Sequence, residues 1–210
     1  ATAANFSPLR IYNSTYSVDW TGKDPDSKAL FSTLNVDYGW FETNKVALVE
    51  GRVFEKRFVD TTSYVLNETA ASYLGKEGAV VGEYFELWGL KGKVIGVAKD
   101  FHFSSLHNEV NPLIIMHRPD NGFWQLLVKA KPGKIADVIT QLDQLSAEHD
   151  PAYPFEYEIV SDVYTNMYAR DQKTGVIFRA FAGLSIIISC LGLFGLSAFA
   201  AEQRTKEIGI

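Results

Sequence analysis

One uncharged stretch constrains this chain more than any other feature of its sequence. Residues 180–201 read AFAGLSIIISCLGLFGLSAFAA, with Arg179 directly before them and Glu202 directly after. A helix of this length extends about 33 Å, against about 30 Å for the hydrocarbon core of a bilayer. A buried core helix is the alternative, but such a helix usually keeps a polar stripe, and nothing here is more polar than serine. We therefore predict a transmembrane helix over Ala180–Ala201.

Small residues inside the predicted span follow one another at steps of three or four. Such steps return to one face of a helix, so they predict a seam against which another transmembrane helix packs. Close packing matters there because lipid provides no hydrophobic force for helix association. The seam consists of Ala182, Ser185, Ser189, Gly192 and Gly195.

Charges beside the span do not decide its orientation. Basic residues lie on both sides, since Arg170, Lys173 and Arg179 precede it and Arg204 and Lys206 follow it. The excess of Lys and Arg that marks a cytoplasmic flank is therefore not clear. The chain begins at Ala1 in a polar stretch and ends at Gly209 and Ile210 within a predicted helix, so we expect it to be a fragment.

The residues before the span predict an α+β domain of short strands and a few helices. A helix over 67–74 is expected to be capped by Asn67, and the spacing of apolar residues from Ile135 to Leu145 predicts an amphipathic helix that packs on the sheet. Another helix is expected from Asp162 through the span, with Gly175 as a candidate break. Strands are expected over 16–20, 31–38, 64–66, 83–87, 93–98, 113–116, 124–129 and 155–160, with a hairpin turn at 89–92.

Composition excludes several classes of protein. The net charge of −5 argues against a nucleic-acid partner, which requires clustered positive charge. A single cysteine, Cys190, excludes an internal disulfide and a cysteine-based zinc site. The phosphate-binding pattern G-x-x-x-x-G-K-[ST] is absent, so this chain carries no Walker ATP site. We expect no cofactor.

One short segment contains the residue types of a hydrolase. Strand alternation would place Asp100, His102 and Ser104 on one face, as in a catalytic triad, although real triads converge from distant segments. His102 and His107 are five residues apart, a spacing that does not bring two metal ligands together. We interpret this segment as a polar strand edge and keep an anchored periplasmic hydrolase as the third functional alternative.

The end of the chain resembles a known family. The stretch from Gly192 to Ile210, which ends in EQRTKEIGI, is similar to the end of the second transmembrane helix and the segment after it in MacB/FtsX-type ABC transporter permeases. Residues 51–54 (GRVF), 66–68 (LNE) and 94–103 (VIGVAKDFHF) resemble segments of that family's extracytoplasmic domain, in the variety typical of Bacteroidetes. The resemblance is weakest over 1–38.

This resemblance implies an arrangement of four segments. They are a MacB-like periplasmic domain over 1–160, a stalk helix over 161–179, the transmembrane helix over 180–201, and the start of a cytoplasmic coupling segment over 202–210. The chain would lie in the bacterial inner membrane with residues 1 to about 175 in the periplasm. The coupling segment would dock on a separate ABC ATPase subunit through Glu202, Arg204, Thr205, Lys206, Glu207, Ile208 and Gly209.

The family also implies a function without enzyme activity in this chain. The permease would couple cytoplasmic ATP hydrolysis to a change of shape in the periplasmic domain, in efflux, lipoprotein handling or a similar process. Its other partners would be membrane lipid, further helices of the permease, a second copy or permease half, and a periplasmic protein. The main alternative is an FtsX-like membrane-anchored regulator of a periplasmic cell-wall enzyme, or a sensor.

Overall fold

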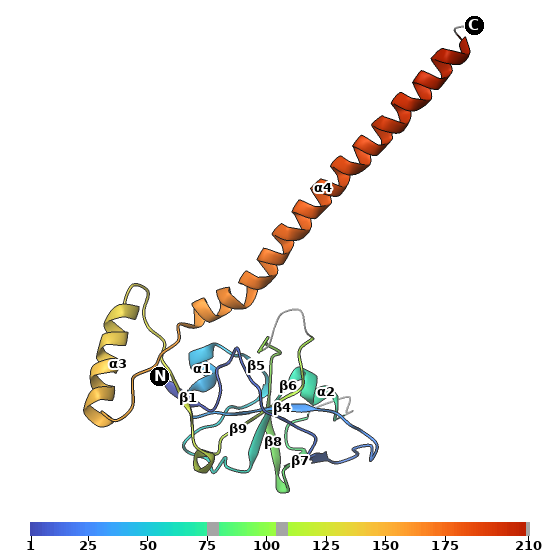
Figure 1. Cartoon of the computed structure of the whole chain (residues 1–210). Helices are drawn as coiled ribbons and strands as arrows, with labels where there is room; N and C mark the ends of the chain where they lie inside the picture. The colour runs from blue at the N-terminus through green and yellow to red at the C-terminus, as the bar shows by residue number, and fades with distance from the viewer. Residues whose placement is uncertain (75–79, 104–108, 209–210) are drawn as a thin grey trace. The chain divides into compact units, whose positions relative to one another are not determined.

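A strand of four large apolar residues, β9 (Leu113–Met116), lies at the centre of the main sheet, and all four of its residues are buried. It is seen in a computed structural model that describes residues 1–74, 80–103 and 109–208. The chain divides into two compact units, residues 1–156 and 157–210, and each is described by itself. The first unit contains all of the strands (Figure 1).

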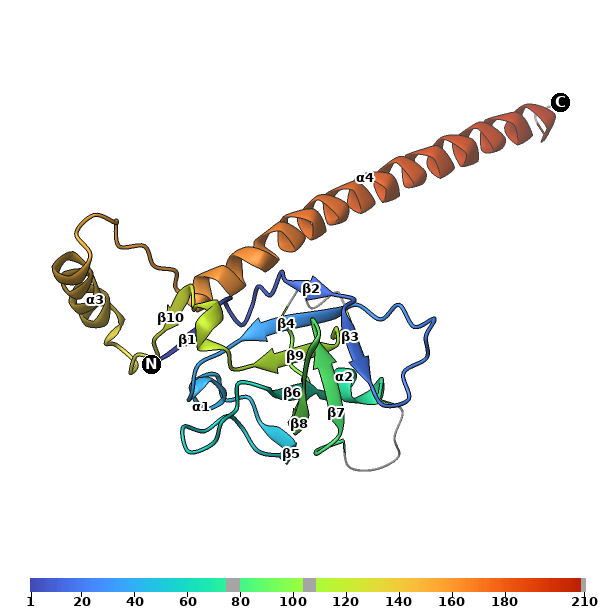
Figure 2. The ribbon, with the colours of Figure 1, turned by 90° about the horizontal axis from the view of Figure 1, so that it is seen from below.

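The main sheet is mixed and has the strand order β2–β4–β9–β6–β8–β7–β3, with β5 paired to β8 beside this path. The pairs β4–β9 and β6–β8 are parallel and the remaining pairs are antiparallel. Figure 2 shows β4, β9 and β6 side by side in the sheet. The other strands are β2 (Ser14–Thr15), β3 (Val18–Trp20), β4 (Phe31–Asn35), β5 (Leu48–Gly51), β6 (Ser63–Asn67), β7 (Tyr84–Leu87) and β8 (Leu90–Ala98).

The central strands are buried on both faces because their residues supply two cores in alternation. Along β6, Tyr64 and Leu66 enter one core and Val65 enters the other. In β9, Ile114 shares the first core with Tyr64, and Ile115 shares the second with Val65. A strand between two apolar layers reads as a continuous apolar run, which is why 113–116 was predictable from the sequence.

The helix predicted after Asn67 is present as α2 (Glu68–Ser72), and its cap is confirmed. The Asn67 side-chain oxygen accepts a hydrogen bond from the Ala70 amide at 2.9 Å. This bond satisfies one of the amides that have no partner within the first turn of a helix. The sequence did not predict α1 (Trp40–Asn44), a single turn that buries Trp40 and Phe41 in the second core.

The predicted hairpin forms, but its turn is shorter than expected. Strand β8 already begins at Leu90, so the turn consists of Trp88 and Gly89 instead of residues 89–92. Both have positive φ, 53° for Trp88 and 77° for Gly89, as two-residue hairpin turns require. Gly92 therefore lies inside β8, where a Cβ would come within 1.7 Å of the Thr62 carbonyl oxygen.

Three expectations for the ends of the first unit are wrong. Residues 1–10 are not wholly irregular, because β1 (Thr2–Ala4) pairs antiparallel with β10 (Gln125–Leu127) in a small second sheet. The amphipathic helix forms as α3 (Ile135–His149), but none of its residues is buried, so it does not pack on the sheet. Amphipathic spacing shows which side of a helix is apolar, but not which surface meets it.

The third error concerns residues 155–160, which form no strand. Residues 155–159 have no regular structure, and Val160 is the first residue of α4. A segment of alternating apolar and polar residues forms a strand only if a neighbouring strand is present to hydrogen-bond with its backbone. The sequence of the segment itself does not show whether such a neighbour exists. The 3₁₀ turn η1 (Pro119–Asn121) completes the elements before α4.

A long helix, α4 (Val160–Ile208), forms most of the second unit. Its 49 residues continue through Gly175 without a break and extend about 73 Å. The fold predicted from the sequence, a mixed domain followed by a long helix that includes the apolar stretch, is therefore confirmed.

An ion pair between the buried Asp60 and the half-buried Arg52 holds the loop between β5 and β6 in the first unit. The Arg52 guanidinium donates to both carboxylate oxygens of Asp60, at 2.8 and 2.9 Å, and the Glu55 amide donates to the same carboxylate at 3.1 Å. Burial raises the pKa of the Asp60 carboxyl, but these hydrogen bonds outweigh it and leave the pKa below its ordinary value. The pair therefore stabilises the fold above about pH 4, and this contribution is lost as the pH falls through the lowered pKa.

We expect Asp60→Asn to lower the free energy of unfolding by about 1–2 kcal/mol at pH 7, because it weakens the hydrogen bonds that the buried carboxylate accepts from Arg52 and Glu55. The exposed pair Lys134–Asp137, at 2.7 Å, provides a matched control, and Asp137→Asn should cost less than about 1 kcal/mol. Urea unfolding followed by tryptophan fluorescence measures both, since all four tryptophans lie in the first unit. Equal losses in the two variants would contradict the structural role of Asp60.

Candidate functional site

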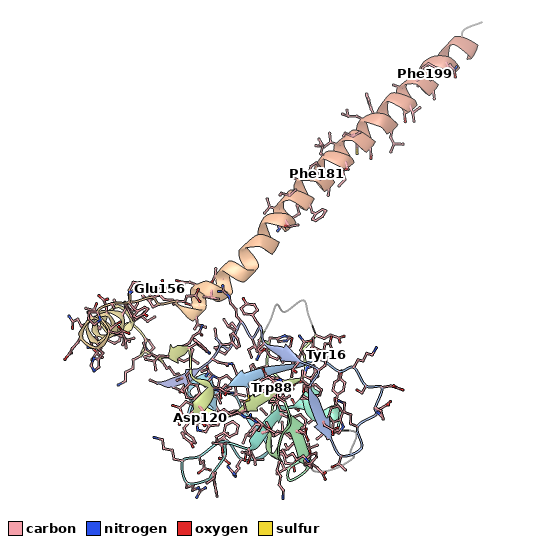
Figure 3. All side chains as sticks on the ribbon, turned by 60° about the horizontal axis from the view of Figure 1, so that its bottom comes forward. Tyr16, Trp88, Asp120, Glu156, Phe181 and Phe199 are labelled. Atoms are coloured by element: carbon pink, nitrogen blue, oxygen red, sulfur yellow. The ribbon has the colours of Figure 1, made fainter. Side chains whose placement is uncertain are left out.

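The apolar part of α4 is the largest uncovered apolar surface among the described residues. It extends from Thr174 to Ala201, 28 residues that are long and apolar enough to cross a membrane. Figure 3 shows Phe181 and Phe199 on this part of the helix, and their exposed fractions are 64% and 62%. Exposed apolar surface of this extent marks a membrane or protein contact.

The apolar part of α4 that begins at Thr174 includes Arg179, whereas the uncharged stretch within it begins at Ala180. Val176, Ile177 and Phe178, which precede this arginine, are exposed apolar residues like those that follow it. The predicted boundaries of the stalk, span and coupling segment stay predictions, because the helix itself is continuous across all of them.

The five residues of the predicted seam are all exposed on α4, as a helix-packing surface requires. At about 100° per residue they spread over an arc of about 140°, with Ser185 and Gly192 at its centre. The Ser189 hydroxyl donates to the Ser185 carbonyl oxygen at 2.8 Å, so this polar group is satisfied within the helix. A Cβ at Gly192 or Gly195 would meet no atom within 4 Å, so the helix itself does not require glycine at these positions.

The coupling segment is described only in part. The backbone of α4 is helical from Glu202 to Ile208. The side chains of Glu202, Arg204, Thr205, Lys206, Glu207 and Ile208 lie outside the described part of the structure, as do the whole of Gly209 and Ile210. The docking role of these residues stays a prediction.

The triad-like segment has a different geometry from the one that alternation predicts. Strand β8 ends at Ala98, so Asp100 and His102 do not continue its pleat, and Ser104 lies outside the described residues, as does His107. One Asp100 carboxylate oxygen accepts hydrogen bonds from the Asn67 amide group at 2.7 Å and the Thr69 backbone amide at 3.1 Å. The other accepts one from the Thr69 hydroxyl at 2.7 Å. Asp100 thus holds the start of α2, while His102 is exposed.

Asn67 joins this cluster to the centre of the sheet, which the sequence did not reveal. Besides capping α2, its side-chain oxygen accepts a hydrogen bond from the Leu113 amide at 2.7 Å, and its amide group donates to the Asn111 carbonyl at 3.0 Å. One buried side chain therefore connects β6, α2 and the entry to β9. The sequence signal, an Asn before a helix, predicts the cap alone. Within the described ranges, no group of three or more His, Cys, Asp or Glu residues is placed to hold a metal ion.

A comparison with characterised proteins gives a clear relative. Macrolide export ATP-binding/permease protein MacB 2 of Aeromonas hydrophila subsp. hydrophila is 26% identical over 192 residues. The match covers 85% of this chain and 29% of that protein, so the chain spans less than a third of the length of the curated relative. No family model matches the chain.

Solved structures show the same fold. The periplasmic region of MacB from Actinobacillus actinomycetemcomitans matches with a TM-score of 0.53 at 14% identity, over 79% of this chain and 74% of that one. The extracellular domain of the noncanonic ABC-type transporter YknZ from Gram-positive bacteria matches with a TM-score of 0.51 at 11% identity, over 72% and 76%. This chain is similar in sequence to a MacB protein, and its fold is that of the periplasmic or extracellular domains of two ABC-type transporters. The resemblance predicted from residues 51–54, 66–68, 94–103 and 192–210 is thereby confirmed.

The likeness to MacB also bears on the orientation that the charges left open. A MacB-like domain followed by the apolar helix Thr174–Ala201 fits a protein of the inner membrane whose N-terminal part is periplasmic.

The geometry of Asp100 predicts a structural role for it and none for His102. Asp100→Ala should lower the free energy of unfolding by about 1–3 kcal/mol, because it leaves the Thr69 and Asn67 donors without their acceptor. His102→Ala should change it by less than about 0.5 kcal/mol, as is usual for exposed positions. Urea unfolding of both variants gives the two values. A hydrolytic activity of the full-length protein that disappears in His102→Ala at unchanged stability would contradict this assignment.

Proposed function

We propose that this chain is the part of an ABC transporter permease that carries motion between a cytoplasmic ATPase and a periplasmic domain. The continuity of α4 from Val160 to Ile208 carries the proposal. An α-helix without a break is stiff along its axis, since every turn is hydrogen-bonded to the next. A displacement at its cytoplasmic end therefore reaches the periplasmic end without a hinge between them.

The energy for this motion comes from outside the chain. The sequence lacks a Walker ATP site, and the name of the curated relative joins ATP binding to a permease. We therefore assign ATP hydrolysis to an ABC ATPase outside residues 1–210, on which the coupling segment docks, and we propose that this ATPase is a separate subunit. Two states with different contacts at the docking surface would bias the position of α4, which is what coupling between distant sites requires.

Charge at the coupling segment provides the first test. Glu207→Lys reverses one charge of the segment, and Glu148→Lys makes the same change on the exposed helix α3, away from the proposed contact. After gentle detergent purification of the full-length protein from its own membranes, we expect Glu207→Lys to recover about tenfold less ATPase than the wild type. The Glu148→Lys control should recover as much as the wild type. Equal recovery in both variants, or a wild type without any ATPase, would contradict the proposal.

The seam provides the second test. Gly192 lies at the centre of the predicted seam, and Gly183 lies nine residues earlier, on the opposite face of the helix. Neither glycine has a neighbouring atom that a Cβ would meet, so Gly→Leu at either position is tolerated by the helix itself. We expect Gly192→Leu to lower the temperature at which the detergent-solubilised full-length protein loses its assembly, because leucine separates the packed helices. Gly183→Leu should leave this temperature unchanged. The same temperature in both variants would contradict a packing role for the seam.

A further inference from the structure

Arg179 is a charged residue with apolar surface on both sides of it. Val176, Ile177 and Phe178 lie one turn before it, with exposed fractions of 61%, 56% and 70%, and Phe181 follows at 64%. A stalk helix in water would not need three consecutive large apolar residues before the arginine. The membrane contact of α4 therefore includes the turn that precedes Arg179.

The length of the apolar stretch fixes the depth of this arginine. From Arg179 to Ala201 the helix rises about 33 Å, slightly more than a hydrocarbon core of about 30 Å. When Ala201 lies at the cytoplasmic boundary, Arg179 lies at the opposite boundary and Val176–Phe178 lie among the lipid headgroups. A position deeper in the hydrocarbon is disfavoured, because charged residues there are costly.

Most of the hydrogen-bond donors of the Arg179 guanidinium are not used within the helix. Its Nε donates to the Gly175 carbonyl oxygen at 3.2 Å, which directs the side chain toward the preceding turn and away from the membrane centre. A guanidinium has five N–H groups, so those of the two terminal nitrogens remain. In the described part of the chain, no carboxylate pairs with them.

The face of α4 around Arg179 leaves these donors accessible. Gly175, Ala182 and Gly183 lie three or four residues from Arg179 and share its face. A Cβ at Gly175 would lie 3.8 Å from the nearer terminal nitrogen, an ordinary contact, so alanine fits there while a branched side chain would cover the guanidinium.

We propose that Arg179 binds the phosphate group of a membrane phospholipid in the periplasmic leaflet. At the headgroup boundary the abundant acceptor is the lipid phosphate diester, and a planar guanidinium binds such a group through two parallel hydrogen bonds. The bound lipid would hold the depth and rotation of α4. This inference requires α4 to span the membrane, but not the proposed coupling to an ATPase.

The test measures lipid retention by the full-length protein in detergent. Phosphatidylglycerol is titrated in, and bound lipid is counted by native mass spectrometry without nucleotide. We expect Arg179→Gln to weaken binding about tenfold and Arg179→Lys to weaken it less, since lysine keeps the charge but loses the paired geometry. Gly175→Leu should weaken it as much as Arg179→Gln although the charge remains, and Gly175→Ala should bind like the wild type.

Three results would overturn the proposal. Wild-type lipid retention by Arg179→Gln would show that the lipid does not depend on this residue. If Arg179→Gln binds as much lipid as the wild type but loses its assembly, the partner of Arg179 is instead a carboxylate on another helix. Displacement by inorganic phosphate at the lipid concentration would indicate a site for soluble anions. Circular dichroism of the purified full-length protein checks that each variant is folded.

Discussion

The absence of charge along most of one helix is the constraint on which the rest of this structure depends. Exposing 28 residues of apolar helix to water is unfavourable, so Thr174–Ala201 requires lipid or other helices around it. Inside a bilayer a helix satisfies its own backbone hydrogen bonds, which makes an unbroken α4 the stable form there. The stiffness needed to connect the two sides of a membrane therefore follows from the same property that places the helix in the membrane.

The first unit is stabilised in a different way, through a few buried polar side chains between two apolar cores. Asn67 joins β6, α2 and the entry to β9, and Arg52 with Asp60 holds the loop before β6. A similar buried amide, Asn35, donates to the Arg118 and Gly122 carbonyls at 2.9 and 3.1 Å and so holds the turn after β9. These contacts fix the loops at both ends of the central strands.

Much of this architecture could be predicted, and the misses share a physical cause. The transmembrane helix, the apolar strand 113–116, the cap at Asn67 and the hairpin depend on local patterns, and local patterns are visible in a sequence. The predicted packing of α3 and the predicted strand at 155–160, which the structure does not show, would each require a partner surface. The sequence of a segment does not show whether its partner surface exists. The role of Asp100 was hidden for the same reason, since it is bound by Thr69 and Asn67 from a distant segment.

The central claim is that α4 carries the chain from the periplasm to the cytoplasm, and labelling of single cysteines tests it most directly. Every cysteine of the full-length protein, including Cys190, is replaced by serine, and a new cysteine is placed at Asp120 or at Gln203, both exposed. A membrane-impermeant maleimide is then added to intact spheroplasts of cells that make the full-length protein. The account predicts that Asp120→Cys is labelled at once and that Gln203→Cys is labelled only after the membrane is permeabilised. Labelling of both positions from the same side would contradict the transmembrane placement of α4 and the coupling that depends on it.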